Sequence, residues 1–208
     1  MTFALPNDLR ALPQDVTLIA VSKQQPDEAL QSALDTGQRH FGENRVQEAQ
    51  RHWAHRRKDY PDLHLHLIGP LQSNKTREAV ALFDVIHTVD REKIARALKS
   101  EMTAQEKDLP CFIQVNIGNE PQKAGVDPAG LSDFHALCTQ EIGLTIIGLM
   151  CLPPAGEPAL PYFQELKKRG DVLGVTQFSM GMSSDYKEAL QAGATFLRVG
   201  SALFGARS

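Results

Sequence analysis

Short apolar runs alternate along the chain with longer segments in which apolar residues recur at helical spacing. The run Leu18–Val21 is typical, because it is long enough for a strand buried on both faces and too short to span a membrane. Such runs predict strands at Thr17–Ser22, Arg39–Phe41, His64–Ile68, Asp84–His87, Cys111–Ile117, Leu144–Met150, Val175–Ser179 and Phe196–Val199. The segments between them predict helices at about Asp27–Thr36, Arg45–Lys58, Asn74–Leu82, Arg91–Ala104, Pro128–Glu141, Pro161–Arg169 and Ser184–Ala192.

This alternation predicts an α/β fold, a single (β/α)8 barrel of the TIM type. Gly37 and Gly193 follow predicted helices, at the position where a left-handed glycine commonly ends a helix. Only Ser201–Ser208 follows the last strand, so we expect a short eighth helix or the amino-terminal segment in its place. A doubly wound sheet is the alternative, although it more commonly has five or six strands. No linker interrupts the pattern, which predicts one domain over residues 1–208.

Composition narrows the class of protein. The net charge of −3 argues against a nucleic-acid-binding surface, and no apolar stretch approaches the length of a membrane span. The segment Met1–Asp8 lacks the basic region and apolar core of a secretory signal. The three cysteines, Cys111, Cys138 and Cys151, are too widely spaced for a CxxC site, and they suit a reducing cytoplasm. A barrel without an obvious exposed apolar stripe predicts a monomer.

Lys23 stands at the carboxyl end of the first predicted strand. Functional residues of such barrels lie at the carboxyl ends of the strands, so this lysine is expected to project into the mouth of the barrel. An amine placed there can act as a neutral nucleophile toward carbonyl compounds. The alternative interpretation is a solvated lysine that simply ends a strand.

The loops after the seventh and eighth strands contain the residue types of a phosphate site. Ser179, Gly181, Gly200 and Ser201 combine small hydroxyl side chains with glycines, which let backbone N–H groups approach a phosphate closely. In barrels of this type, these two loops often build such a site. The alternative is that serine and glycine only fill tight loops.

Two further features concern charged or titratable residues in strands. Arg198 lies in the apolar run Phe196–Val199, where an unpaired guanidinium is costly. Either a carboxylate pairs with it, Glu43 being one possibility, or it faces a ligand. His64 and His66 share one face of the third strand, and without a placed carboxylate we interpret them as strand-face histidines rather than metal ligands.

Five motifs occur in the order in which a known family has them. They are Ala20–Lys23, Phe41–Asn44, His66–Lys75, Ser179–Ser183 and Arg198–Gly205. From about Thr17 to Arg207 the chain resembles the pyridoxal phosphate homeostasis proteins. The resemblance implies the fold of the alanine racemase amino-terminal barrel, with pyridoxal 5′-phosphate (PLP) as cofactor.

The resemblance also implies roles for individual residues. Lys23 matches the lysine that forms a Schiff base with PLP, Asn44 a polar residue beside the cofactor, and Arg198 the arginine that faces the pyridine nitrogen. The implied phosphate contacts are Ser179, the N–H of Met180, Gly200 and Ser201. Compared with the family pattern, the amino terminus is short, the position of Ser201 is often threonine, and the segment between strands six and seven is trimmed.

These residues imply a cofactor carrier rather than an efficient enzyme. Arg198 can only donate hydrogen bonds, which favours an unprotonated pyridine nitrogen and a weaker electron sink. Racemases of this type also use a tyrosine from a second domain, whereas Tyr60, Tyr162 and Tyr186 are predicted to lie far from the strand ends. We therefore expect a protein that stores PLP or delivers it to PLP-dependent apoenzymes. The alternatives are a PLP-dependent fold-type III amino-acid racemase and a Schiff-base aldolase without cofactor.

Overall fold

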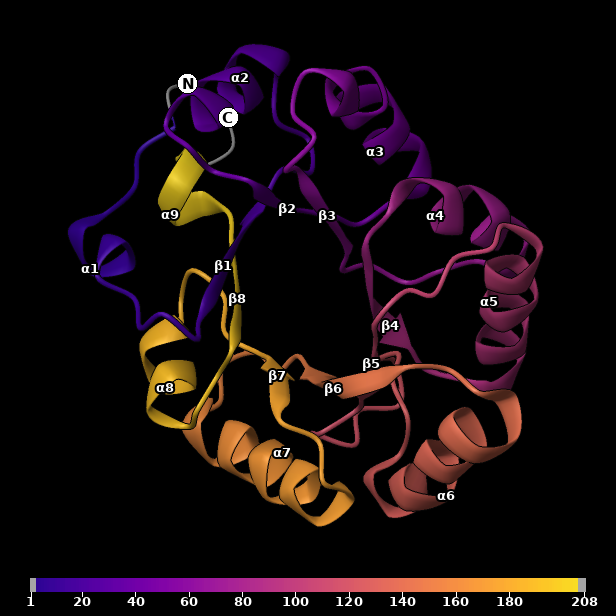
Figure 1. Ribbon diagram of the computed structural model, residues 1–208. Coiled ribbons are helices and arrows are strands. Elements are labelled where there is room, and N and C mark those ends of the chain that lie inside the picture. The colour runs from indigo at the N-terminus through magenta and orange to yellow at the C-terminus, as the bar shows by residue number, and fades with distance from the viewer. Residues whose placement is uncertain (1–2, 206–208) are drawn as a thin grey trace.

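In the computed structural model, which describes residues 3–205, parallel strands close into a barrel surrounded by helices (Figure 1). The strands follow one another around the barrel in chain order, and β8 pairs with β1. They are β1 Thr17–Val21, β2 His40–Glu43, β3 His64–Leu67, β4 Val85–Val89, β5 Cys111–Val115, β6 Ile146–Cys151, β7 Gln177–Ser179 and β8 Phe196–Val199. The predicted barrel and its eight strands are confirmed, and the predicted strand ends are off by at most two residues. That residues 1–208 form one domain stays a prediction, since its two ends lie outside the described residues.

Helices on the outside of the barrel connect the strands. They are α1 Asn7–Arg10, α2 Asp27–Asp35, α3 Val46–Trp53, α4 Thr76–Leu82, α5 Glu92–Ala104, α6 Leu131–Ala136, α7 Leu160–Leu173, α8 Tyr186–Gln191 and α9 Ser201–Phe204. Short 3₁₀ turns lie at Arg56–Lys58, Ser73–Lys75 and Pro128–Gly130, and a π-helical turn at Leu137–Ile142 continues α6. Within residues 3–205, no helix has the length and apolarity needed to cross a membrane.

Helix α7 continues one turn beyond its predicted end at Arg169. A glycine inside a helix usually costs about 1 kcal/mol relative to alanine. Here the missing side chain makes room for a ring, because a Cβ on Gly170 would lie only 2.3 Å from Cε1 of Phe178. The helix instead ends at Gly174, which has a left-handed φ of 73°.

The place of the eighth helix, beside β1 and β8, is filled by a short helix and also by the amino-terminal segment, which are the two possibilities expected from the sequence. Helix α9 is only four residues long, and it lies beside these strands (Figure 1). The amino-terminal segment packs against it, since the N–H of Ala4 donates to the carbonyl of Leu203 at 2.9 Å. The ring of Phe3 contacts that of Phe204 edge to face, with centroids 5.3 Å apart.

Alternation along the strands divides buried side chains between two regions. Outward residues, such as Phe41 and Phe178, join Trp53 in the main core between strands and helices. A smaller apolar cluster of Val85, Phe112 and Met150 lies apart from that core. Because side chains of a strand alternate between faces, the strand positions of this cluster put it inside the barrel. Beside it lie buried polar side chains, which form the floor of the candidate site.

Candidate functional site

Closure of the barrel brings the residues predicted from the sequence to one end of the fold. Lys23 lies just past β1, Asn44 directly follows β2, and Arg198 is the penultimate residue of β8. Ser179 ends β7, and Gly200 leads from β8 into α9. Since these four strands are neighbours in the order β7, β8, β1, β2, their carboxyl ends meet at the same mouth of the barrel.

The turn that carries Lys23 is held by its backbone. The N–H of Gln25 donates to the carbonyl of Ser22 at 3.1 Å, which closes the turn. Gln24 has a φ of 59°, an uncommon conformation for a residue other than glycine, and its N–H donates to the carboxylate of Glu48 in α3. Lys23 itself is half-buried. The half-buried lysine is therefore carried by backbone that is anchored on both sides.

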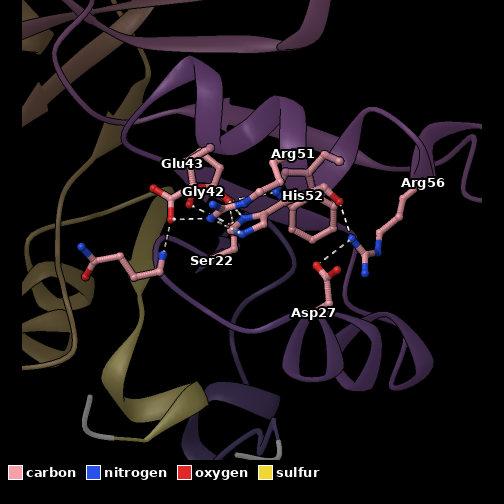
Figure 2. Close-up of polar contacts among 10 residues, drawn as sticks. Ser22, Asp27, Gly42, Glu43, Arg51, His52 and Arg56 are labelled. Carbon is pink, nitrogen blue, oxygen red and sulfur yellow. Dashed lines mark hydrogen bonds and ion pairs between the residues drawn. The ribbon is translucent and has the colours of Figure 1, made fainter. Parts of the chain in front are cut away.

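Glu43 connects this turn with α3, as Figure 2 shows. Its carboxylate is fully buried, and one oxygen, Oε1, contacts three donors. They are the hydroxyl of Ser22 at 2.7 Å, Nδ1 of His52 at 2.8 Å and the indole N–H of Trp53 at 3.0 Å. Glu43 therefore joins the ends of β1 and β2 to the helix that packs behind them.

Glu43, Glu48 and His52 also form the one group found among residues 3–205 whose ligand atoms lie close enough to hold a metal ion, within 4.8 Å of one another. The guanidinium of Arg51 lies 3.3 Å from Nε2 of His52, and its positive charge opposes a cation there. Donors already surround Oε1 of Glu43, so we assign this group a structural role.

Arg198 is buried, but its partners differ from those considered from the sequence. Glu43 is not among them. The guanidinium donates instead to the hydroxyl of Ser179 at 2.6 Å and to the carbonyl of Cys151 at 2.8 Å. No carboxylate within the described part of the chain forms an ion pair with it, and burial lowers its pKa to about 10. Arg198 thus remains charged at neutral pH in the floor of the mouth.

Ser183, which the sequence analysis did not select, lies where an anion could bind. Its hydroxyl oxygen accepts the N–H of Gly200 at 3.2 Å and that of Ala202 at 3.3 Å. Two converging backbone N–H groups are the donors that a phosphate oxygen requires. The sequence did contain a signal, because Ser183 ends the motif that begins at Ser179, and Gly181, with a φ of 90°, turns the chain back toward β8.

The groups that the resemblance assigned to a phosphate divide between two places. The hydroxyl of Ser179 contacts Arg198 and His87, and the N–H of Met180 donates to the carbonyl of Phe196 at 3.1 Å. Both are therefore engaged inside the barrel wall. Gly200 and the exposed Ser201 lie instead at the start of α9, next to Ser183.

Asn44 lines a cavity of about 1040 Å³ at the mouth, between the loops that follow β2 and β3. Gln24, the neighbour of Lys23, lines it too. The cavity is also lined by the basic side chains of Arg45, Arg51, Lys75 and Arg91. Glu48 is the one carboxylate among these lining residues, so positive side chains outnumber negative ones and favour anionic ligands.

The tyrosines lie on outer elements and have partners there. The phenol oxygen of Tyr60 accepts a hydrogen bond from Gln31 at 2.8 Å. Tyr162 and Tyr186 donate to the surface carboxylates of Glu157 and Asp8, and these hydrogen bonds raise the pKa of both phenols. Tyr162 and Tyr186 stand in the first turns of α7 and α8, and their phenol groups are bonded to side chains of the outer surface.

Comparison with known proteins defines the class. The family model of the alanine racemase N-terminal domain matches residues 7–208. An alanine racemase of Clostridium difficile superposes with a TM-score of 0.73 over 94% of this chain and 54% of its own, at 14% identity, which establishes the shared fold alone. The fold is that of an alanine-racemase-type barrel.

Relatives with higher sequence identity indicate the family within this class. A pyridoxal phosphate homeostasis protein of Vibrio alginolyticus is 41% identical, over 94% of this chain and 88% of its own length, and that of Escherichia coli K12 is 37% identical, over 94% and 87%. The structure of PipY from Synechococcus elongatus with PLP bound has a TM-score of 0.88 and 42% identity, over 95% of this chain and 97% of PipY. The chain belongs to the family of pyridoxal phosphate homeostasis proteins.

Proposed function

We propose that this chain binds PLP through Lys23 and takes part in PLP homeostasis, without substantial catalytic activity. The observation that carries the proposal is the convergence, at one barrel mouth, of a lysine, a buried guanidinium and two backbone N–H groups beside a serine hydroxyl. The PLP-bound relative, 42% identical over nearly the whole chain, supports it.

The residues present fit the chemical groups of PLP. When bound, PLP supplies an aldehyde that condenses reversibly with a primary amine, so it can be held covalently and still be released. Lys23 offers the amine, and Asn44 a polar side chain beside it. The hydroxyl of Ser183, whose oxygen accepts from the N–H groups of Gly200 and Ala202, offers a donor for a phosphate.

Arg198 suits holding the cofactor better than catalysis. A guanidinium has only donors, so it favours an unprotonated ring nitrogen, and the ring then withdraws electrons less strongly. A racemase additionally needs a second base at the mouth, and the tyrosines of residues 3–205 are bound elsewhere. A racemase remains the competing function, and incubation with single L-amino acids followed by chiral analysis separates the two. Turnover at ordinary enzyme rates would contradict the carrier function.

The proposal also covers the partners, the oligomeric state and the location of the protein. A reversible covalent link at an open mouth suits transfer of PLP to PLP-dependent apoenzymes, and we propose that the chain acts as a monomer in the cytoplasm. Size measurement in solution and transfer assays with a PLP-dependent apoenzyme test these points.

Lys23 is tested by adding PLP to the purified protein. We expect a visible absorption band that is lost on borohydride reduction, and a pyridoxyl group on the peptide containing Lys23. The variant Lys23→Ala should lack both. The matched control Lys93→Ala, which changes an exposed lysine of α5, should retain both. A protein that takes up no PLP, or a Lys23→Ala variant with unchanged spectrum and stoichiometry, would contradict the assignment. If borohydride trapped a Schiff base on the protein only after a carbonyl substrate was added, the result would instead favour the aldolase without cofactor.

Ser183 and Ser179 can be distinguished as phosphate ligands. We expect Ser183→Ala to weaken PLP binding about tenfold or more, because a hydrogen bond to a charged group contributes about 1.5–3 kcal/mol. Binding of pyridoxal, which lacks the phosphate, should change little. Ser184→Ala removes an exposed neighbouring hydroxyl and serves as control. If Ser179→Ala rather than Ser183→Ala caused the phosphate-specific loss, the assignment from the sequence would be correct.

A further inference from the structure

A continuous row of hydrogen-bonded side chains crosses the interior of the barrel. Nδ1 of His40 lies 3.0 Å from Nε2 of His66, and Nδ1 of His66 lies 3.0 Å from Nε2 of His87. Nδ1 of His87 lies 2.8 Å from the hydroxyl of Ser179, which accepts from Arg198. We call His40, His66 and His87, from the neighbouring strands β2, β3 and β4, the histidine row.

Arg198 determines the direction of these hydrogen bonds. Because a guanidinium only donates, the hydroxyl oxygen of Ser179 must accept from it. Ser179 is fully buried, and its hydroxyl proton would lack an acceptor unless it pointed at Nδ1 of His87. His87 must then carry its proton on Nε2 and donate to Nδ1 of His66. The same argument places the proton of His66 on Nε2, directed at His40.

The surroundings keep the row neutral. Burial lowers the pKa of His66 and His87 well below the ordinary value, and neighbouring charge adds to this, from Arg198 in the case of His87. The pKa of His40 falls to about 4, again mainly through burial, with His64 lowering it further and Asp84 opposing. A neutral imidazole has one donor and one acceptor, which is what each member of the row requires.

Ring packing fixes the orientation of the row. His87 stacks on Phe112 with centroids 4.4 Å apart and an interplanar angle of 17°. At the other end, His40 stacks on the exposed His64 at 4.7 Å and 8°. The row therefore begins near the amino-terminal face of the barrel and ends at the floor of the mouth.

We infer that the histidine row positions Arg198, by holding the hydroxyl of Ser179 as an acceptor for its guanidinium. Ser179, His87, His66 and His40 are then positioning residues, and the guanidinium is kept from turning into the barrel. This inference rests on the proposed function where it concerns PLP, since Arg198 is the group assigned to the ring of the cofactor. The orientation of the row itself does not depend on PLP.

The first experiment is long-range ¹H–¹⁵N NMR of the full chain labelled with ¹⁵N-histidine, without PLP. We expect neutral rings with the proton on Nε2 for all three members of the row at neutral pH. A proton on Nδ1 of His87, or a doubly protonated ring in the row, would overturn the inference.

The second experiment interrupts the row at its middle member, His66, which bonds to His40 and His87 rather than to Arg198. His66→Leu should let the guanidinium N–H signals of Arg198 exchange faster with water and should weaken PLP binding about tenfold, the scale seen when outer partners of metal ligands are lost. It should also shift the visible band of bound PLP. His66→Gln, which keeps a donor and an acceptor, should restore much of both, and His64→Leu should change neither.

The outcomes of the two experiments are separable. Unchanged Arg198 exchange and an unchanged PLP band in His66→Leu would overturn the positioning role. If the wild-type protein bound no PLP, the proposed function would fail, and the Arg198 exchange rates would still decide whether the row positions that side chain. If His66→Leu did not fold, the tautomers of the wild-type protein would decide the inference.

Discussion

Replacing Glu43 by alanine is expected to lower the free energy of unfolding by about 3–5 kcal/mol, because several buried donors would lose their acceptor at once. The hydroxyl of Ser22, Nδ1 of His52 and the indole of Trp53 all contact Oε1 of the fully buried Glu43. His52 and Trp53 would remain buried without this acceptor, and the hydroxyl of Ser22 would keep only its longer hydrogen bond to the carbonyl of Gly42, at 3.3 Å. The loss should also loosen the turn next to Lys23, so PLP binding should weaken together with stability.

Urea unfolding with a matched pair of variants measures this effect. In Glu43→Gln the amide oxygen can take the place of Oε1 and accept from the same donors. The amide N–H₂ then takes the place of Oε2, which has no hydrogen-bond partner in this structure. Glu43→Gln should therefore lose less than Glu43→Ala. Glu141→Ala, at an exposed position, should change stability by less than about 0.5 kcal/mol. Equal losses in both Glu43 variants would mean that the negative charge, rather than the acceptor, stabilises the fold.

Mild acid is expected to destabilise the protein strongly. His66 and His87 have a lowered pKa in the fold because burial disfavours the charged ring, so below about pH 6.5 the unfolded chain binds protons that the folded one does not. Their contribution to stability is therefore complete above that pH and is lost as the pH falls. Between about pH 7.5 and 5.5 each ring should cost about 1.4 kcal/mol, or about 2.7 kcal/mol for both. His40 and His135, also with lowered pKa, act in the same direction.

Urea unfolding at a series of pH values measures this loss. His66→Gln removes one of the two buried rings that titrate. It should therefore roughly halve the loss of unfolding free energy that these two histidines cause between about pH 7.5 and 5.5. His55→Gln, which changes an exposed histidine, should leave the pH dependence unchanged. Stability that stayed constant down to about pH 5.5 would contradict the neutral state of the buried rings.

The sequence predicted the fold well because its signals are local. Apolar runs such as Leu18–Val21 become buried strands wherever they occur, and left-handed glycines end helices at Gly37 and Gly193. One error in the predicted helix ends has a tertiary cause. Helix α7 continues through Gly170 because the ring of Phe178, from a strand that follows it, occupies the space of the missing side chain.

The candidate site was predicted in part. The positions of Lys23, Asn44 and Arg198 at one mouth follow from their places at strand ends, which the pattern reveals. The partners of Glu43 and Arg198 do not follow, because either could have paired with the other on charge alone. Ser183 was overlooked although it ends the motif that begins at Ser179, because only the contact with the N–H groups of Gly200 and Ala202 distinguishes it from the other serines of that motif.

By itself, the sequence determined the order of strands and helices, the barrel, the family and the lysine that ends the first strand. These depend on periodicity and motif order, which are properties of neighbouring residues. Only the tertiary structure decided which polar groups meet inside the barrel. The contact between His87 and Ser179 joins residues 92 positions apart, and closure of the sheet alone brings them together. The hydrogen-bonded floor beneath the mouth is therefore a consequence of the closed barrel.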